Sequence, residues 1–497
     1  MGRPHLHCRA CKIDCIMPIS RRDFLELAAA TAITGSSSLS QTNTVSMRPN
    51  IVLILADDHR WDALGCMGNP IIQTPQIDRL SGEGVTFDNH FCTTPICCAS
   101  RASIMLSQYS GTNGIYDFST PLSHEQVEQT YWHQLKQAGY YIGFIGKFGV
   151  GDHMPSDSFD YWKGFAGQGN YFPQGIPGPH LTHIMRDQAN EFFKGVPRDR
   201  PFCLSISFKA PHVQDESPEQ YLPSPDTYSL YKDVTIPPPS GASPDDIQRF
   251  PLALQRSESR HRWGVRFATP YLYQASVKGY YRLISGIDSA IGSMRETLSK
   301  LGLADNTILI YSADHGIFNG EHGLAGKWYG HEESIRTPLI IYDPRVRHNA
   351  IGKRCKAMTL NIDLHPTILE FAGLLPSPAT QGKSLSPLLL NNELNRRHVW
   401  FIEHHFPDGG WIPSSEGIRT ERWKYLCYTD TASPFEELYD LLHDPHETHN
   451  LIDNPQYAHE QSILKTYRIL WRDSLRNRSQ NWVEPIDGQR LKQDRMS

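Results

Sequence analysis

The 497-residue sequence is short of three things that would mark a specialised class of protein. Cysteine is sparse, with 10 residues in the whole chain, so a disulfide scaffold is excluded and each thiol has to be considered by itself. Positive charge is not in excess, because 48 Lys and Arg stand against 53 Asp and Glu, and this argues against a general nucleic-acid-binding protein. No run of 18 or more apolar residues follows residue 34, so we expect no stable membrane insertion there.

Length and composition describe a large globular protein. Hydrophobic residues make up 39% of the chain and charged residues 20%, which excludes a coiled coil and a wholly disordered chain. At roughly 150 residues per domain, the chain has room for about three domains, or for one large α/β domain with an appendage.

The first 45 residues have the features of an export signal. Arg21 and Arg22 precede a weakly apolar stretch at 27–33, and small residues follow at 35–38. This order is typical of a twin-arginine signal, and the alternative is a frayed amphipathic helix. We therefore predict export to the periplasm or the extracellular space, with residues 1–45 as signal and leader.

Four short apolar runs end abruptly in polar or charged residues. They cover residues 50–55, 141–145, 202–208 and 307–311. Continuous apolar runs, rather than strict alternation, are typical of strands buried on both faces of a parallel sheet, and they predict an α/β fold. The residues that follow the runs are Asp57-Asp58, Gly146-Lys147, Lys209 with His212, and Asp314-His315. Because ligands bind at the carboxyl ends of such strands, we expect these residues to meet there.

Two segments between the runs have the pattern of helices. Apolar residues recur at helical spacing from Tyr280 to Leu298, and Gly302 follows as a stop signal. A second helix is predicted from Asp363, a good N-cap residue, to Gly373.

The remaining segments divide by composition. Pro, Gly, Ser and aromatic residues dominate between about 155 and 275, and loops of this length usually form lids or binding loops. Strands at 398–402 and 423–428, with a closing helix at about 456–476, predict a smaller sheet. The domains that we assign are 46–385, a large catalytic domain, and 386–497, a C-terminal subdomain.

Acidic residues at two of the strand ends suggest a metal site. Adjacent acids such as Asp57 and Asp58 usually cap a helix or face water, but here they end a buried run, where two carboxylates repel each other unless a cation lies between them. Asp314 and His315 repeat the arrangement. Three carboxylates and one imidazole are mostly hard oxygen ligands, which favours Ca²⁺ or Mg²⁺ over Zn²⁺.

The segment Cys97-Cys98-Ala99-Ser100-Arg101 carries the most specific signal. It resembles the type I sulfatase signature, Cys-x-Pro/Ala-Ser-Arg followed by a helix. Position 99 is Ala where Pro is usual, and only Cys97 has the correct offset to Ser100 and Arg101. The alternatives for Cys97 are a buried structural thiol, a vicinal disulfide and an ordinary thiolate nucleophile.

The resemblance to the type I sulfatases extends over nearly the whole mature chain. It implies an alkaline-phosphatase-like α/β/α sandwich with a mostly parallel central sheet and a small antiparallel C-terminal sheet. The further segments that carry it are Lys209-Ala210-Pro211-His212, Ser312 to Gly316, Gly320 to Gly323, Gly326-Lys327, Glu332 to Pro338, Gln381 to Leu385, and Glu437 to Glu447.

The resemblance implies a modified cysteine beside a metal ion. In this family a formylglycine-generating or sulfatase-maturating enzyme oxidises the cysteine, here Cys97, to formylglycine, an aldehyde that hydrates to a geminal diol. One hydroxyl of the diol attacks sulfur, and the second loses its proton when sulfate is expelled. The metal ligands implied are Asp57, Asp58, Cys97, Asp314 and His315, with Ca²⁺ favoured over Mg²⁺.

Four further residues match family positions around the sulfate. Lys147 and Lys327 correspond to the sulfate-binding lysines, and each follows a Gly. Arg101, four residues after Cys97, can reach back to the diol or to the metal-side carboxylates. His212 corresponds to the histidine near the leaving group, and a near-neutral pKa would suit an acid.

The sequence departs from the family pattern in two places. Many members have a His two residues after the lysine that matches Lys147, where this chain has Gly149. Either His153 substitutes for that histidine, or another group assists the diol. Position 331 is His where Tyr is common, a change that falls either on a substrate contact or on a position without functional effect.

The leading interpretation is an exported, formylglycine-dependent sulfatase that acts on a sulfated sugar. Two alternatives are a phosphate or phosphonate ester hydrolase with the same metal site, and a non-catalytic glycan-binding protein in which Cys97 is never oxidised. Residues in the expected pocket loops that suit sugar stacking or hydrogen bonding are Trp328, Tyr329, His404, His405 and Trp411.

Overall fold

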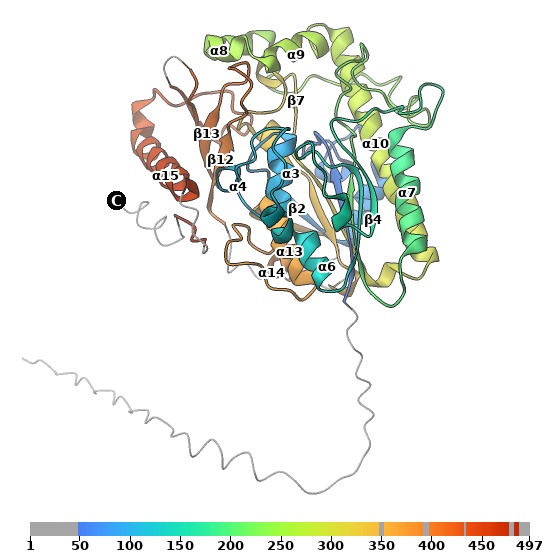
Figure 1. The fold of residues 1–497 in the computed structure, drawn as a ribbon. Coiled ribbons are helices and arrows are strands. Elements are labelled where there is room, and N and C mark those ends of the chain that lie inside the picture. Colours follow the sequence, from blue (N-terminus) through green and yellow to red (C-terminus); the bar gives the residue numbers. More distant parts are fainter. Residues whose placement is uncertain (1–47, 347–351, 391–396, 432–433, 477–481, 487–497) are drawn as a thin grey trace, which may run out of the picture. The chain divides into compact units, whose positions relative to one another are not determined.

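A nine-stranded sheet forms the centre of the protein in the computed structural model, which describes residues 48–346, 352–390, 397–431, 434–476 and 482–486 (Figure 1). The strand order is β11-β2-β10-β6-β1-β5-β3-β4, with β9 paired to β2, and only the pairs of β10 and β9 are antiparallel. The sheet is therefore mostly parallel, as predicted. The strands are β1 (Asn50–Ala56), β2 (Val85–Phe91), β3 (Tyr141–Lys147), β4 (Tyr161–Phe165), β5 (Phe202–Ser207), β6 (Thr307–Ala313), β9 (Arg336–Thr337), β10 (Leu339–Tyr342) and β11 (Lys353–Leu360).

Helices cover both faces of this sheet. Val52 and Ile54 of β1 belong to an apolar core shared with α2, α7 and α10, whereas Ile51 and Leu53 belong to a core shared with α3, α6 and α13. Burial on both faces explains why the strands have continuous apolar sequences. These helices are α2 (Pro75–Glu83), α3 (Cys97–Leu106), α6 (Tyr131–Gln137), α7 (Leu181–Gly195), α10 (Pro270–Lys300) and α13 (Leu364–Phe371).

Shorter elements connect these layers. The short helices are α4 (Ser110–Asn113), α5 (His124–Gln129), α8 (Leu252–Gln255), α9 (Glu258–Arg266), α11 (Glu332–Ile335) and α14 (Ser386–Leu389), and a two-stranded ribbon pairs β7 (Phe318–Asn319) with β8 (Ala325–Gly326).

Both predicted helices are present, but with one difference in capping. The helix expected at 280–298 is the later part of α10, which starts after Thr269, whose hydroxyl accepts the Leu272 N–H, and ends just before Gly302 at φ +68°. Asp363 precedes α13, yet its carboxylate accepts the Leu360 N–H at 2.7 Å instead of a helix N–H. The predicted N-cap role of this side chain is therefore wrong.

The segment at 155–275 is more regular than its composition predicts. Besides β5, which was expected, it contains β4, α7, α8 and α9. In α7, Met185, Ala189 and Phe192 lie four and three residues apart and pack into the core. This helical spacing was hidden by the Pro- and Gly-rich sequence on either side.

The C-terminal part forms a four-stranded antiparallel sheet, ordered β12-β13-β14-β15, with α15 against one face. Its other face packs on the large sheet, as the 5.2 Å between the Phe91 and Trp400 rings shows. The strands are β12 (Val399–His404), β13 (Ser415–Thr420), β14 (Trp423–Tyr428) and β15 (Phe435–Asp440), and α15 is Ala458–Arg476. Strands β12 and β14 and helix α15 confirm the predicted elements.

Two further observations concern segments considered in the sequence. Within the described ranges, no helix combines the length and apolarity needed to cross a bilayer. The seven cysteines in those ranges carry free thiols, so the vicinal disulfide considered for Cys97 and Cys98 is not formed. The predicted export signal at 1–45 lies outside the described residues.

Candidate active site

The site lies where the carboxyl ends of adjacent parallel strands meet helix α3. Strand β1 pairs with both β5 and β6, and β3 pairs with β5, so the residues after all four strands reach the same edge. Cys97 is the first residue of α3, where the helix N-terminus favours negative charge. The residues brought together are Asp57 and Asp58 after β1, Lys147 at the end of β3, Lys209 and His212 after β5, and Asp314 and His315 after β6.

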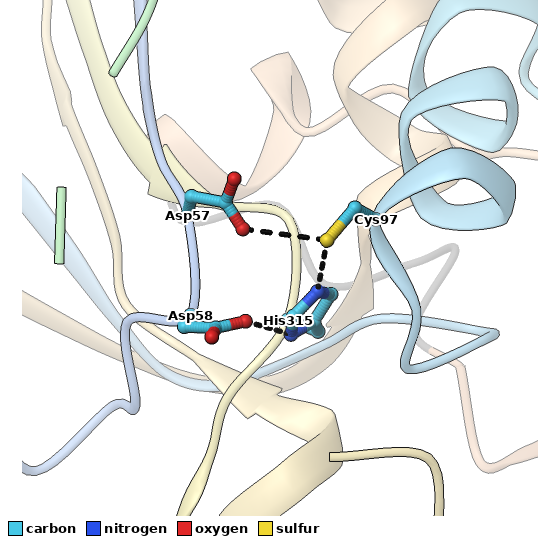
Figure 2. A group of neighbouring side chains, drawn as sticks. All are labelled: Asp57, Asp58, Cys97 and His315. Carbon is cyan, nitrogen blue, oxygen red and sulfur yellow. Dashed lines mark hydrogen bonds and ion pairs between the residues drawn. The ribbon is translucent and has the colours of Figure 1, made fainter. Parts of the chain in front are cut away.

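Four of the five predicted metal ligands form one buried group (Figure 2). One ligand atom each from Asp57, Asp58, Cys97 and His315 lies within 4.8 Å of the others. Cys97 Sγ is 3.4 Å from Asp57 Oδ1 and 3.3 Å from His315 Nε2, and His315 Nδ1 is 3.3 Å from Asp58 Oδ1. Two carboxylates and an imidazole around one point are a donor set that fits a divalent cation.

Asp314, the fifth predicted ligand, is beside this group but has other partners. Its Oδ2 accepts Arg101 Nε at 2.9 Å, and its Oδ1 accepts the backbone N–H groups of Asp58 and His315. Asp58 itself has φ +65°, a conformation that costs free energy for a non-glycine residue. Asp314 therefore holds the turn that carries Asp58.

Arg101 links the helix to the ends of four strands. Besides Asp314, its guanidinium contacts the Asp57 carboxylate at 3.3 Å, the Lys147 carbonyl at 2.8 Å and the Ser207 hydroxyl. The residue is fully buried, so these contacts are shielded from water. The prediction that Arg101 reaches back to the metal-side carboxylates agrees with this geometry.

The missing histidine at position 149 has a steric explanation. Gly149 has φ +74°, and a Cβ built there would lie 2.8 Å from Arg101 Cδ. A side chain at this position would therefore require Arg101 to move. His153 is exposed, and the structure gives no support for its acting in place of the family histidine.

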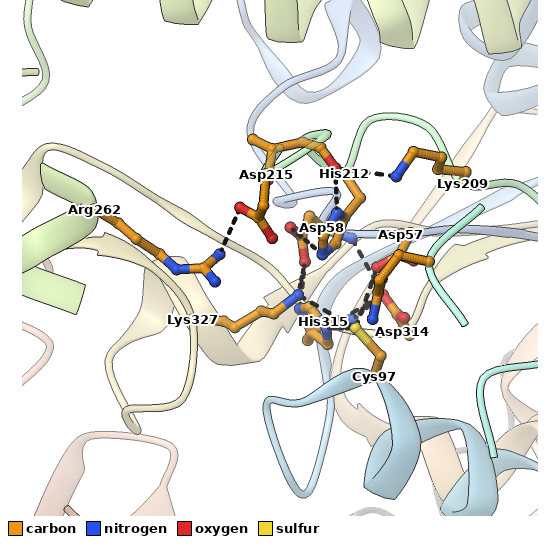
Figure 3. Close-up of polar contacts among 12 residues, drawn as sticks. Asp57, Asp58, Cys97, Lys209, His212, Asp215, Arg262, Asp314, His315 and Lys327 are labelled. Atoms are coloured by element: carbon orange, nitrogen blue, oxygen red, sulfur yellow. Dashed lines mark hydrogen bonds and ion pairs between the residues drawn. The ribbon is translucent and has the colours of Figure 1, made fainter. Parts of the chain in front are cut away.

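Two buried lysines contact the group around Cys97. Lys327 Nζ lies 2.6 Å from Asp58 Oδ1 and 3.2 Å from Cys97 Sγ (Figure 3). Lys147 Nζ pairs with Asp57 Oδ2 and also donates to Gln168 Oε1 at 2.6 Å. Both lysines are buried, so their charges act on the site with little screening.

The charges shift the protonation of the acids and bases strongly. Burial alone would raise the pKa of Asp57, but Lys147, His212 and Arg101 together hold it well below its ordinary value. Burial alone would lower the pKa of His315, whereas Asp314 outweighs that effect and raises the pKa to about 9. The Asp57 carboxylate is therefore ionised at neutral pH.

His212 differs from the sequence-based expectation. Burial, followed by the positive charge of Lys327, lowers its pKa well below the ordinary value, so the near-neutral pKa that we expected is wrong. Its Nδ1 lies 2.7 Å from the Val213 carbonyl and therefore carries the proton of the neutral ring. Nε2 points toward Asp58 Oδ2, 3.7 Å away.

Sequence reasoning missed four residues at the site. Ser207 and Gln168 contact Arg101 and Lys147, and Asp215 and Arg262 form a 3.2 Å ion pair near His212 and Lys327 (Figure 3). Ser207 ends a predicted strand, and Gln168 stands between two glycines with positive φ, so both had a weak positional signal. Asp215 and Arg262 had none, because their contact joins distant segments.

His331 packs against residues of the C-terminal sheet and of the segment before α11. It is fully buried, its Nε2 lies 3.4 Å from Glu437 Oε1 on β15, and its ring centroid is 4.6 Å from that of His322. These contacts show that the change from Tyr affects the packing between the large sheet and the C-terminal sheet.

Comparison with known proteins agrees with this geometry. Residues 49–374 match the sulfatase family model, and residues 320–471 match the model of the C-terminal region of N-sulphoglucosamine sulphohydrolase. The chain belongs to the sulfatase family. This membership confirms the resemblance inferred from the Cys97 segment and the α/β fold of the alkaline-phosphatase-like superfamily.

The sulfatase is similar to relatives over most of its length. It is 28% identical to the N-acetylglucosamine-6-O-sulfatase of Bacteroides thetaiotaomicron, over 93% of this chain and 92% of the relative. It is also 28% identical to an arylsulfatase of Clostridium perfringens, over 85% of this chain and 94% of the relative. These relatives support the predicted enzyme class, a hydrolase of sulfuric esters.

Solved structures give the same result. A protein in complex with its substrate D-glucosamine-2-N,6-O-disulfate has a TM-score of 0.73 and 27% identity to this sulfatase, with 86% of this chain and 97% of that chain covered. The phosphonate monoester hydrolase of Agrobacterium radiobacter shares the fold, with a TM-score of 0.69 and 22% identity. The match covers 86% of this chain and 96% of that chain.

Proposed function

We propose that this sulfatase hydrolyses sulfate monoesters on a sulfated carbohydrate, with Cys97, oxidised to formylglycine, as the nucleophile. The observation that carries the proposal is the position of Cys97 Sγ, which lies within 3.4 Å of Asp57, His315 and Lys327 in a buried site. An atom placed there is surrounded by groups that can accept its proton or bind the anion that it attacks.

A divalent cation, Ca²⁺ in our proposal, would be held by Asp57, Asp58, His315 and the modified residue 97, with Asp314 supporting them. When bound, the cation supplies Lewis acidity toward a sulfate oxygen and lowers the pKa of a neighbouring hydroxyl. Asp57 suits this role, because its pKa is already held well below the ordinary value and it stays ionised at neutral pH.

The lysines and His212 complete the chemistry that sulfate ester cleavage needs. Lys327 contacts Cys97 and Lys147 pairs with Asp57, and both lysines would neutralise the sulfate oxygens. His212 would hold a proton at Nε2 for the leaving oxygen. Its low pKa would rise with an anionic ester bound between it and Lys327, because that anion offsets the positive charge that lowers the pKa.

A sulfated sugar is the substrate class that the relatives favour. Two of them are named for sulfated glucosamine, one as an N-acetylglucosamine-6-O-sulfatase and one by its bound glucosamine disulfate. Export through the twin-arginine route, with Cys97 oxidised by a maturation enzyme, would place the protein where extracellular sulfated polysaccharides occur.

The test of the nucleophile compares two neighbouring cysteines. Cys97→Ala should lower desulfation of sulfated oligosaccharides by about 10⁴-fold or more, because the covalent route is removed. Cys98→Ala should retain most of the activity, since Cys98, the next residue of the same helix, packs into the apolar core. Near wild-type turnover in Cys97→Ala, or an unmodified thiol in the Cys97 peptide by mass spectrometry of active protein, would overturn the proposal.

The metal is tested by thermal unfolding. Ca²⁺ at 100 times its dissociation constant should stabilise the folded protein by about 2.7 kcal/mol, and a chelator should remove that gain together with activity. Asp58→Asn should abolish the Ca²⁺-dependent rise in Tm, whereas Asp305→Asn, on the connection before β6, should not. An equal Ca²⁺-dependent rise in Tm in both variants would show that Asp58 is not a ligand of the ion.

The competing reaction is hydrolysis of phosphonate monoesters, since a protein of this fold is named for it. Matched aryl sulfate and aryl phosphonate esters distinguish the two by kcat/KM. A large preference for the phosphonate would replace the sulfate assignment and leave the nucleophile in place.

A further inference from the structure

A shallow groove of about 300 Å³ lies beside helices α8 and α9, outside the group around Cys97. We call it the Trp411 groove. Its exposed aromatic ring is unusual, because 64% of the Trp411 surface is accessible, and Leu252 across from it is 62% accessible. The groove is lined by Leu252, Ala253, Arg256, Gly409, Gly410 and Trp411.

We propose that the Trp411 groove is a second glycan subsite, which binds a sugar ring further along the chain that carries the cleaved sulfate. The proposal rests on the proposed function and deepens it, because it makes a sulfated oligosaccharide, rather than a sulfated monosaccharide or a small aryl sulfate, the preferred substrate.

The chemistry of the groove fits an anionic sugar. An indole ring offers a flat apolar face on which the C–H face of a pyranose stacks, while the indole edge stays hydrated. Arg256 is exposed, and no described side chain pairs with its guanidinium, so it is available for a sulfate or carboxylate on the same sugar.

The loop that carries Trp411 is held in a defined shape. Asp408 Oδ1 accepts the Gly410 N–H at 3.0 Å, and both Gly409 and Gly410 have positive φ, so the backbone can approach a ligand closely.

A short series of contacts joins the groove to the active site. The Trp411 carbonyl accepts the Glu258 N–H at 3.0 Å at the start of α9, and Glu258 Oε1 accepts Arg262 Nε at 2.7 Å, one turn later. Arg262 contacts Asp215 (Figure 3). Its guanidinium also lies over the ring of Trp328, the residue after Lys327. One turn of α9, from Glu258 to Arg262, therefore connects the Trp411 groove with the residues beside Lys327.

The experiment compares long and short substrates. The substrates are sulfated tetrasaccharides from heparin, chondroitin and ulvan, the sulfated monosaccharides from their ends, and 4-nitrophenyl sulfate. Trp411→Ala should lower kcat/KM about tenfold on the best tetrasaccharide, chiefly through KM, and leave 4-nitrophenyl sulfate within about twofold of wild type. Trp411→Phe should recover much of the loss, because a flat ring remains.

Tyr271→Ala is the matched control, since Tyr271 is an exposed aromatic residue, 79% accessible, outside the groove. Equal kcat/KM of Trp411→Ala and wild type on every tetrasaccharide would overturn the subsite while leaving the sulfatase assignment intact. Equal losses on tetrasaccharides and on 4-nitrophenyl sulfate would also overturn it. A dimer that Trp411→Ala dissociates, with unchanged glycan kinetics, would assign the groove to a second copy of the chain. Absence of turnover of every sulfate ester by wild type would instead count against the proposed function.

Discussion

At the scale of single residues, Gly149 combines a left-handed backbone conformation with a close approach to Arg101 in the active site. Replacing it by Ala puts a Cβ 2.8 Å from Arg101 Cδ, so the guanidinium that ties Asp57 to Asp314 has to shift. A displacement of about 1 Å in such a site can cost up to about 100-fold in rate. We expect Gly149→Ala to lower kcat by 10- to 100-fold, measured on 4-nitrophenyl sulfate.

Gly302→Ala is the control that separates the displacement of Arg101 from the strain of a left-handed backbone. Gly302 has φ +68°, similar to Gly149, but a Cβ there meets nothing within 4 Å. Both variants should lose about 1–2 kcal/mol of stability, because both force an L-residue into the left-handed region. Only Gly149→Ala should lose activity, and an equal kcat in the two variants would contradict the role given to Arg101.

The sequence predicted the residues of the site better than their partners. Asp57, Asp58 and His315 follow apolar strands, and Cys97 stands in a specific motif, so pattern and position were sufficient to find them. Ser207, Gln168 and the Asp215–Arg262 pair act through contacts between segments far apart in the chain, and no local pattern carries such information.

At the scale of elements, strands β12 and β13 place two acids directly opposite each other. Glu403 pairs with Glu416 across the strands, and it is fully buried with its carboxylate accepting the Gly111 N–H at 3.0 Å. Burial, together with the charge of Glu416, raises the pKa of Glu403 from its ordinary 4.5 to about 7. Like charges opposite each other destabilise an antiparallel pair.

This pair predicts a pH-dependent loss of stability. Between pH 4.5 and about 7 the folded state holds a proton on Glu403 that the unfolded state has lost, so stability falls as pH rises through that window. Glu403→Gln should remove this fall in stability. Its free energy of unfolding should exceed that of the wild type by at most about 3 kcal/mol at pH 8 and differ little from it at pH 4.

The measurement is the Tm of both proteins from pH 4 to pH 8. Glu296→Gln, on the exposed side of α10, serves as the control and should follow the wild-type curve. A constant difference in Tm between Glu403→Gln and wild type across this range would show that Glu403 does not change its protonation there.

Strands and long helices were also the elements that the sequence predicted best. Burial leaves a direct mark on the sequence of these elements. It gives continuous apolar runs in β1, β3, β5 and β6, and apolar residues at helical spacing in α10. Helix α7 and the short helices α8 and α9 were missed, because Pro- and Gly-rich neighbours dominated the composition of that region.

At the scale of the whole molecule, buried ion pairs join the large sheet region to the C-terminal sheet. Lys424 of β14 is fully buried and lies 2.9 Å from Glu332 and 2.7 Å from Glu447. Glu332 opens α11, which directly precedes β9 of the large sheet. Lys424→Met would leave Glu447 without its counter-charge, and we expect it to lower the free energy of unfolding by about 3–5 kcal/mol.

Denaturant unfolding measures this loss. The double variant Lys424→Met/Glu447→Gln should recover part of it, because no unpaired charge is then left buried. Lys300→Met breaks an exposed pair with Glu296 and should change stability by less than about 1 kcal/mol. Losses of equal size in Lys424→Met and Lys300→Met would show that the buried pair does not join the two regions.

The pairing of β1 with β6 also determines when catalytic competence can appear during folding. These neighbours run from Asn50 opposite Thr307 to Ala56 opposite Ala313, so the middle of the sheet closes a loop of more than half the chain. Closing so long a loop is slow, because the segment between β1 and β6 has to become compact before the two strands can pair. Enzymatic competence should therefore return only with the slowest kinetic phase of renaturation, after most helical signal has recovered.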